Sequence, residues 1–186
     1  MQHPFEAIPT GKRRTIFVLL LVLTLVVMAV LNIVDGPLKT DAAPQGIVSF
    51  ELAGKVSTAQ EILDSWDPQA RIHAGFSLGF DFLFMLLYST TIAYACIWVS
   101  NGLQDAWRPL ATVGLLLAWG QWLAALLDAV ENTALLVILL DGAAAAWPQL
   151  AWWCAIVKFI FVLLGLVYAI LGGVWAAKGA GRRRLD

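Results

Sequence analysis

Charged residues are scarce in this sequence. Of its 186 residues only 13% are Asp, Glu, Lys or Arg, whereas 60% are hydrophobic. Soluble domains carry about 25% charged residues, so the composition excludes an ordinary soluble domain and indicates a membrane protein. The length is that of one compact unit.

Cysteine and histidine are also scarce, with Cys96, Cys154, His3 and His73 as the whole set. The histidines are too few and too far apart for a haem or metal site, and no metal-ligand spacing is present. The topology below puts the two cysteines near opposite membrane faces, which excludes a disulfide. No Ser–His pairing or CxxC is present either. We therefore expect neither a metal nor a cofactor.

Long apolar runs dominate what remains. Four of them are long enough to cross a hydrocarbon core of ~30 Å: 15–34, 75–99, 109–140 and 148–177. Basic residues before the first run are typical of a signal peptide, but the run is longer than a signal core, and Ile33-Val34-Asp35 lacks a small-x-small cleavage site. The sequence thus predicts an all-α membrane protein over 1–186, with four transmembrane helices in one antiparallel bundle.

The segment 35–73 is the only sizeable soluble part. Turn-forming residues punctuate its first half: Pro37, Pro44, Gly46 and Gly54. Thr58-x-x-Glu61 resembles a capping box, which predicts a short helix from Thr58 to about Trp66. The expected apolar face of that helix is Val56, Ala59, Leu63 and Trp66. This pattern favours a helix that lies on the membrane or caps the bundle over a dedicated binding element.

The loops predict the orientation. The N-terminal end, the 100–108 loop and the C-terminal end together hold eight Lys or Arg residues, the 35–73 segment holds three, and the 141–149 loop holds none. The positive-inside rule then puts both termini in the cytoplasm, in a bacterial inner membrane, with 35–73 outside. Because each basic cluster adjoins an apolar run, the predicted partner is the lipid bilayer and not nucleic acid.

Lys158 is the one charged residue of the stretch 150–177. A charge at membrane depth is costly and is expected to have a partner. Tryptophan marks membrane interfaces, and Asp81 and Lys158 each lie 17 residues outward of one, Trp98 and Trp175. At ~1.5 Å per residue both are about 25 Å from the inner interface. The candidate partners of the lysine are Asp81, Asp128, Glu131 and Asn132.

Helical periodicity places these residues on shared faces. Two stripes of small and polar residues recur at steps of three and four: Gly114, Ala118, Gln121, Ala125, Asp128 and Asn132, and Cys154, Lys158, Val162, Gly165, Ala169 and Gly172. Small residues line contacts between membrane helices. We therefore expect one polar cluster in the outer half of the bundle, made of Asp81, Asp128, Glu131, Asn132 and Lys158. Glu51 could fold onto it from above.

Three roles for this cluster remain open. It could be an ion-pair network that fixes which helices meet, a site for a lipid, ion or partner helix, or a catalytic pair of aspartates. Its acids outnumber its base, so at least one carboxyl is expected to carry a proton or face a cation. We predict a binding module, with a second copy or another membrane protein as further possible partners. Transport would require oligomers, because a lone four-span unit lacks inverted halves.

The predicted architecture also resembles bacterial lipoprotein signal peptidase, in its small size, its four spans, its cytoplasmic ends and its acids near the outer face. The resemblance implies an intramembrane hydrolase that uses Asp81 and Asp128 as general acid and base. The Asn- and Gly-bearing motifs that accompany the aspartates of that family do not occur here. The resemblance therefore covers architecture and not sequence.

Overall fold

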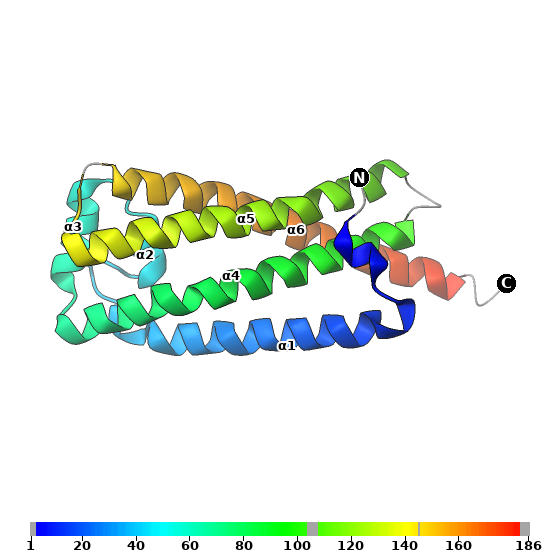
Figure 1. Cartoon of the computed structure of the whole chain (residues 1–186), viewed down its shortest axis with the longest axis horizontal. Helices are drawn as coiled ribbons and strands as arrows, with labels where there is room; N and C mark the ends of the chain where they lie inside the picture. Colours follow the sequence, from blue (N-terminus) through cyan, green and yellow to red (C-terminus); the bar gives the residue numbers. More distant parts are fainter. Residues whose placement is uncertain (1–2, 104–107, 145, 183–186) are drawn as a thin grey trace.

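The protein is built from four long helices and several short ones (Figure 1). A computed structural model describes residues 3–103, 108–144 and 146–182, with side chains up to 175. No strand occurs within these ranges. The elements are η1 Pro4–Ala7, α1 Thr10–Val34, η2 Gly36–Leu38, α2 Ile47–Glu51, α3 Val56–Ser65, α4 Pro68–Leu103, α5 Arg108–Asp141 and α6 Trp147–Arg182.

The long helices alternate in direction and lie side by side as a bundle (Figure 1). Helix α4 packs against α1, α5 and α6, and α5 also packs along α6. Helix α1 packs mainly on α4, and only 17% of its most apolar window is buried, against 50% for α4. The core is therefore a three-helix unit, α4 to α6, with α1 on its outside. The predicted fold class is confirmed.

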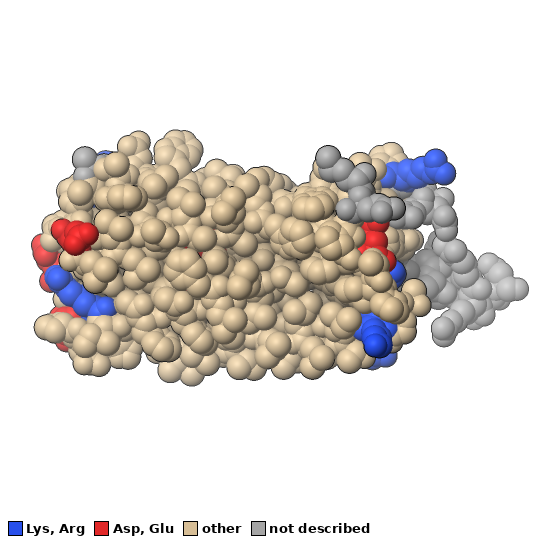
Figure 2. Space-filling model, in the orientation of Figure 1, with Lys and Arg blue, Asp and Glu red and all other residues tan. Residues whose placement is uncertain are grey.

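All four long helices are long and apolar enough to cross a membrane. Lys, Arg, Asp and Glu gather at the two ends of the molecule, and the belt between them is uncharged on the face shown in Figure 2. Exposed residues of this belt are large and apolar, including Leu19, Leu86, Leu126 and Leu163. Such a surface matches the hydrocarbon core of a bilayer.

The helices are longer than the sequence predicted, most of all α4, which begins at Pro68 instead of residue 75. Asp67 accepts a hydrogen bond from the Ala70 amide at 2.7 Å, as an N-cap does, and proline suits the first helical position. The first two turns of α4 are too polar to be recognised as part of an apolar run in the sequence. With 36 residues, α4 measures about 54 Å and projects beyond the membrane core.

Segment 38–66 folds into a cap over one end of the bundle, which we call the cap end. Leu38, Phe50, Ile62, Leu63 and Trp66 are at least 98% buried. They pack on the ends of the long helices, against Ala74, Leu78, Leu135, Ile138 and Ala151. The Trp66 indole also donates to the Leu38 carbonyl at 2.9 Å. Of the two predicted placements, on the membrane surface or over the bundle, the segment adopts the second and caps the bundle.

Two details of the cap differ from the prediction. Helix α3 begins at Val56, and its N-cap residue Lys55 makes no side-chain hydrogen bond. The proposed capping box at Thr58 was therefore wrong, because that residue already lies inside the helix. Val56 is exposed and Ile62 is buried instead. Helix α2 was not predicted, since five residues are too few to show a periodicity.

Glycines let α5 and α6 approach closely, as the predicted stripes implied. A Cβ atom on Gly165 would overlap Gln121 and Ile92, and one on Gly114 would overlap the Tyr168 ring. By contrast, Gly79 on α4 faces open space. Glycine is thus required at the α5–α6 contact and not at every position within the helices.

Replacing Gly165 by valine is expected to destabilise the bundle by about 1–3 kcal/mol, the usual cost of overpacking. The thermal unfolding of the detergent-solubilised protein would measure the loss. Gly79→Val is the matched control, because a Cβ atom at this position has no neighbour within 4 Å. Equal melting temperatures for the two variants would contradict the close packing of α5 and α6.

Candidate functional site

Lys158 of α6 is 5% exposed and lies among carboxylates at the cap end. Its Nζ atom is 2.8 Å from Asp128 Oδ1, 2.9 Å from Glu131 Oε2 and 3.7 Å from Glu51 Oε2. The lysine therefore pairs with α5 and α2. Within the described residues no ion pair joins it to Asp81, the other partner that the sequence left open.

One turn of α5 supplies most of the cluster. Asp128, Glu131 and Asn132 follow at steps of three and one, so they share a face of the helix. All three are at least 98% buried. The two acids contact α6, while the amide of Asn132 donates to Asp81 Oδ2 of α4 at 2.6 Å. Asn132 thus connects Asp81 to the cluster.

Both carboxylate oxygens of Asp128 are occupied. Lys158 Nζ donates to Oδ1, and the Tyr88 hydroxyl of α4 donates to Oδ2 at 2.8 Å. Charge-assisted hydrogen bonds of this kind are the strong ones. Asp128 is therefore the fixed anion of the cluster, held between α4 and α6.

The structure adds two acids to the five predicted residues. Glu51 reaches the cluster from α2, as the sequence allowed. Asp35, directly after α1, accepts a hydrogen bond from Ser77 Oγ at 2.8 Å and was not predicted. Its position immediately after an apolar run was the available signal, because such residues lie where a span ends.

These acids surround a small cavity of about 40 Å³. Its polar lining comes from α1, α2, α4 and α5: Asp35, Glu51, Ser77, Asp81 and Asn132. Leu31, Ile47 and Leu78 complete the wall. A polar cavity needs about 10–15 Å³ to hold one water. The space accommodates water or a small ion and is too small for a lipid headgroup.

Negative charge is in excess here. Five acids gather here and, among the described residues, only two lysines act on them, Lys158 on Glu51, Asp128 and Glu131, and Lys39 on Asp35. The fifth acid, Asp81, lines the same cavity as Asp35 and Glu51. Glu51 Oε2 is buried and accepts no hydrogen bond from a donor in the described part of the chain. A buried carboxylate oxygen without a donor is costly, so this arrangement favours a protonated Glu51.

Burial also favours the protonated form of the carboxyls at the cap end. It raises the pKa of the Glu51 carboxyl above its usual range, and the Lys158 ammonium offsets only part of the rise. Burial also raises the pKa of Asp35, against the opposing effects of the Ser77 hydrogen bond and Lys39. A carboxyl removed from water favours its neutral form. Both cap-end acids thus hold protons more tightly than exposed carboxyls do.

The arrangement is less suited to a metal or to paired-aspartate chemistry. No group of three or more His, Cys, Asp or Glu side chains in the described ranges could hold a metal ion. Asp81 lines the cavity, whereas Asp128 is absent from its lining. The two aspartates therefore do not line this cavity together.

Comparison of the chain with protein-family models, curated proteins and solved structures finds no match. Function is therefore inferred from the chain's own residues.

Lys158→Met is expected to destabilise the protein by about 3–5 kcal/mol, because it leaves two buried carboxylates without their cation. Thermal unfolding in detergent would measure it. The double variant Lys158→Met/Asp128→Asn should recover part of the loss, since it removes one of the stranded charges. A single variant as stable as the wild type would show that the lysine does not hold the bundle together.

Proposed function

We propose that this membrane protein binds a proton at its cap-end acid cluster and couples that proton to docking of the cap. One observation carries the proposal. Glu51, on the cap, is buried with an oxygen that lacks a donor, and it lines a cavity shared with Asp35 and Asp81. Protonation of Glu51 removes the buried negative charge that no donor stabilises, whereas ionisation of Glu51 restores that charge.

The size of the site favours a proton over two of the other predicted ligands, a lipid and a partner helix. A cavity of about 40 Å³ admits water. Lipid headgroups and partner helices are too large for it. Carboxyl groups that share a buried space exchange protons readily with such a water, and acidic residues at membrane depth often mark proton sites.

The site serves one side of the membrane. Farther from the cap, three polar side chains bond across helices: Thr24 to Thr91 at 2.8 Å, Gln121 Nε2 to the Phe161 carbonyl at 2.7 Å, and Ser100 to the Ala111 carbonyl at 2.7 Å. These pairs join helices and do not extend the cavity. In the predicted orientation the cap faces outward, so the protein responds to the pH outside the cytoplasm.

Paired-aspartate hydrolysis remains a prediction with weaker support. It requires Asp128 to exchange a proton, but both oxygens of Asp128 are engaged by Lys158 and Tyr88. Turnover of a lipid-linked peptide that is lost in both Asp81→Asn and Asp128→Asn would favour the hydrolase over the proton site.

Cap docking is expected to weaken as the pH rises. The pKa of Glu51 is raised in the docked state, so the docked state binds the proton more tightly than the undocked one. Docking is then strongest below the ordinary carboxyl pKa of roughly 4 and declines through the raised pKa. Amide hydrogen exchange of α2 and α3, corrected for intrinsic rates at each pH, would measure it.

Glu51→Gln should keep α2 and α3 protected at every pH, because glutamine mimics the neutral acid. Glu61→Gln is the control, since Glu61 is an exposed acid of α3. A cap whose protection is independent of pH in the wild type would contradict the coupling.

The proton itself can be observed by infrared spectroscopy. A protonated carboxyl has a carbonyl band distinct from that of a carboxylate, and we expect such a band well above pH 4, where exposed acids are ionised. Glu51→Gln should reduce the band, and Glu61→Gln should leave it unchanged. Its absence from the wild-type protein near neutral pH would overturn the proposed function.

A further inference from the structure

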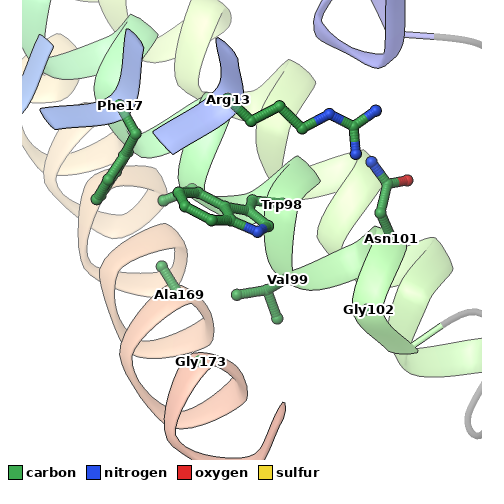
Figure 3. A pocket seen from close by; sticks show the side chains of 9 residues that line it. Arg13, Phe17, Trp98, Val99, Asn101, Gly102, Ala169 and Gly173 are labelled. Carbon is green, nitrogen blue, oxygen red and sulfur yellow. The ribbon is translucent and has the colours of Figure 1, made fainter. Parts of the chain in front are cut away.

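A larger groove opens at the opposite end of the bundle, which we call the basic end. It has a volume of about 660 Å³ and lies between α1, α4 and α6 (Figure 3). Its lining is Arg13 and Phe17 of α1, Ala95, Trp98, Val99, Asn101 and Gly102 of α4, and Ala169 and Gly173 of α6. It lies at the other end of the bundle from the acid cluster and is independent of the proposed function.

The groove follows from how the helices pack. Helices α1 and α6 both contact α4, but they do not pack closely on each other. The α6 residues that face the gap, Ala169 and Gly173, are too small to fill it. Val99 of α4 packs at Gly172 and forms part of the floor. The result is an apolar groove that is one to two helical turns long and is flanked by α1 and α6.

Aromatic residues place this groove at the membrane interface. The Trp98 ring lies between Phe17 of α1 and Ala169 of α6 (Figure 3) and packs edge-on against Phe17 at 5.5 Å. Trp98 is 40% exposed. Exposed tryptophans at the end of a membrane span lie at the level of lipid headgroups. The apolar floor is thus at acyl-chain depth, next to the headgroup layer.

A cation stands at the mouth of the groove. Arg13 Nε donates to the Ile8 carbonyl at 3.0 Å, and its Nη2 donates to the Glu6 carbonyl at 3.4 Å. These backbone acceptors hold the guanidinium without neutralising it. Among the described residues no carboxylate forms an ion pair with Arg13. The exposed residues Lys12 and Arg14 flank it and add to the positive charge.

We propose that this groove binds one anionic phospholipid of the surrounding bilayer. The Arg13 guanidinium binds the phosphate through the N–H groups that the Ile8 and Glu6 carbonyls do not use. An acyl chain lies along Val99, Ala169 and Gly173. The net positive charge at the mouth selects an anionic headgroup over a zwitterionic one, as basic pockets between membrane helices do. The apolar walls select a lipid over free phosphate.

Native mass spectrometry of the full chain, released from nanodiscs of equal phosphatidylglycerol and phosphatidylcholine, tests the proposal. We expect one phosphatidylglycerol to be retained. Arg13→Gln should reduce its occupancy about five-fold, the effect of one basic residue near a charged lipid layer. The control Arg14→Gln removes the same charge from the same helix, from a residue outside the lining, and should change occupancy by less than two-fold.

A second variant tests the acyl-chain half of the site. Gly173→Leu places a side chain on the floor and leaves Arg13 intact. The nearest atom to the new Cβ, Val99 Cγ2, is at 3.9 Å, which is an ordinary contact distance. Gly173→Leu should displace the phosphatidylglycerol, whereas Gly79→Leu at the cap end should retain it. Equal losses in Arg13→Gln and Arg14→Gln would show bulk charge attraction and overturn the site. Full retention in Gly173→Leu, or displacement by inorganic phosphate, would overturn the lipid assignment.

Discussion

The pairing of Lys158 with Asp128 and Glu131 is the interaction on which the cap end depends. A lone ammonium at this depth would be very costly, and two carboxylates on one turn of α5 offset that cost. The pair fixes the rotation of α5 relative to α6. Because Tyr88 holds the other oxygen of Asp128, the same anion also fixes α4. Three helices are thereby registered around one carboxylate.

The excess of acid follows from the same arrangement. Asp128 and Glu131 lie nearer to Lys158 than Glu51 does, at 3.7 Å, so the lysine offsets only part of the effect of burial on Glu51. In the described part of the chain, Lys158 makes no ion pair with Asp81. Ser77 and Asn132 donate hydrogen bonds to Asp35 and Asp81, and we propose that a proton stabilises Glu51. Because Glu51 belongs to the cap, the proposed proton would link the position of the cap to pH. The basic end has the opposite character, with a cation beside an apolar groove.

Much of the site could be predicted from local patterns. Asp128 and Asn132 shared a stripe with small residues, and a charge within an apolar run required a partner, so a cluster including Lys158 followed. Asp35 was missed because it lies at the end of an apolar run. Helical periodicity does not continue past that point, so it cannot predict which way the Asp35 side chain faces. The false capping box arose because Thr58 and Glu61 have the right spacing, but hydrophobic packing of Ile62, Leu63 and Trp66 starts α3 earlier.

The sequence by itself determined the four spans, the helical faces and the presence of a buried polar cluster. These depend on hydropathy and on the 3.6-residue period, which are properties of neighbouring residues. Only the tertiary structure decided that Lys158 pairs with Asp128 and Glu131 and not with Asp81, and that Glu51 covers the cluster. Those choices depend on how helices cross and where the cap folds. Contacts between residues as distant as Glu51 and Lys158 leave no trace in any local pattern.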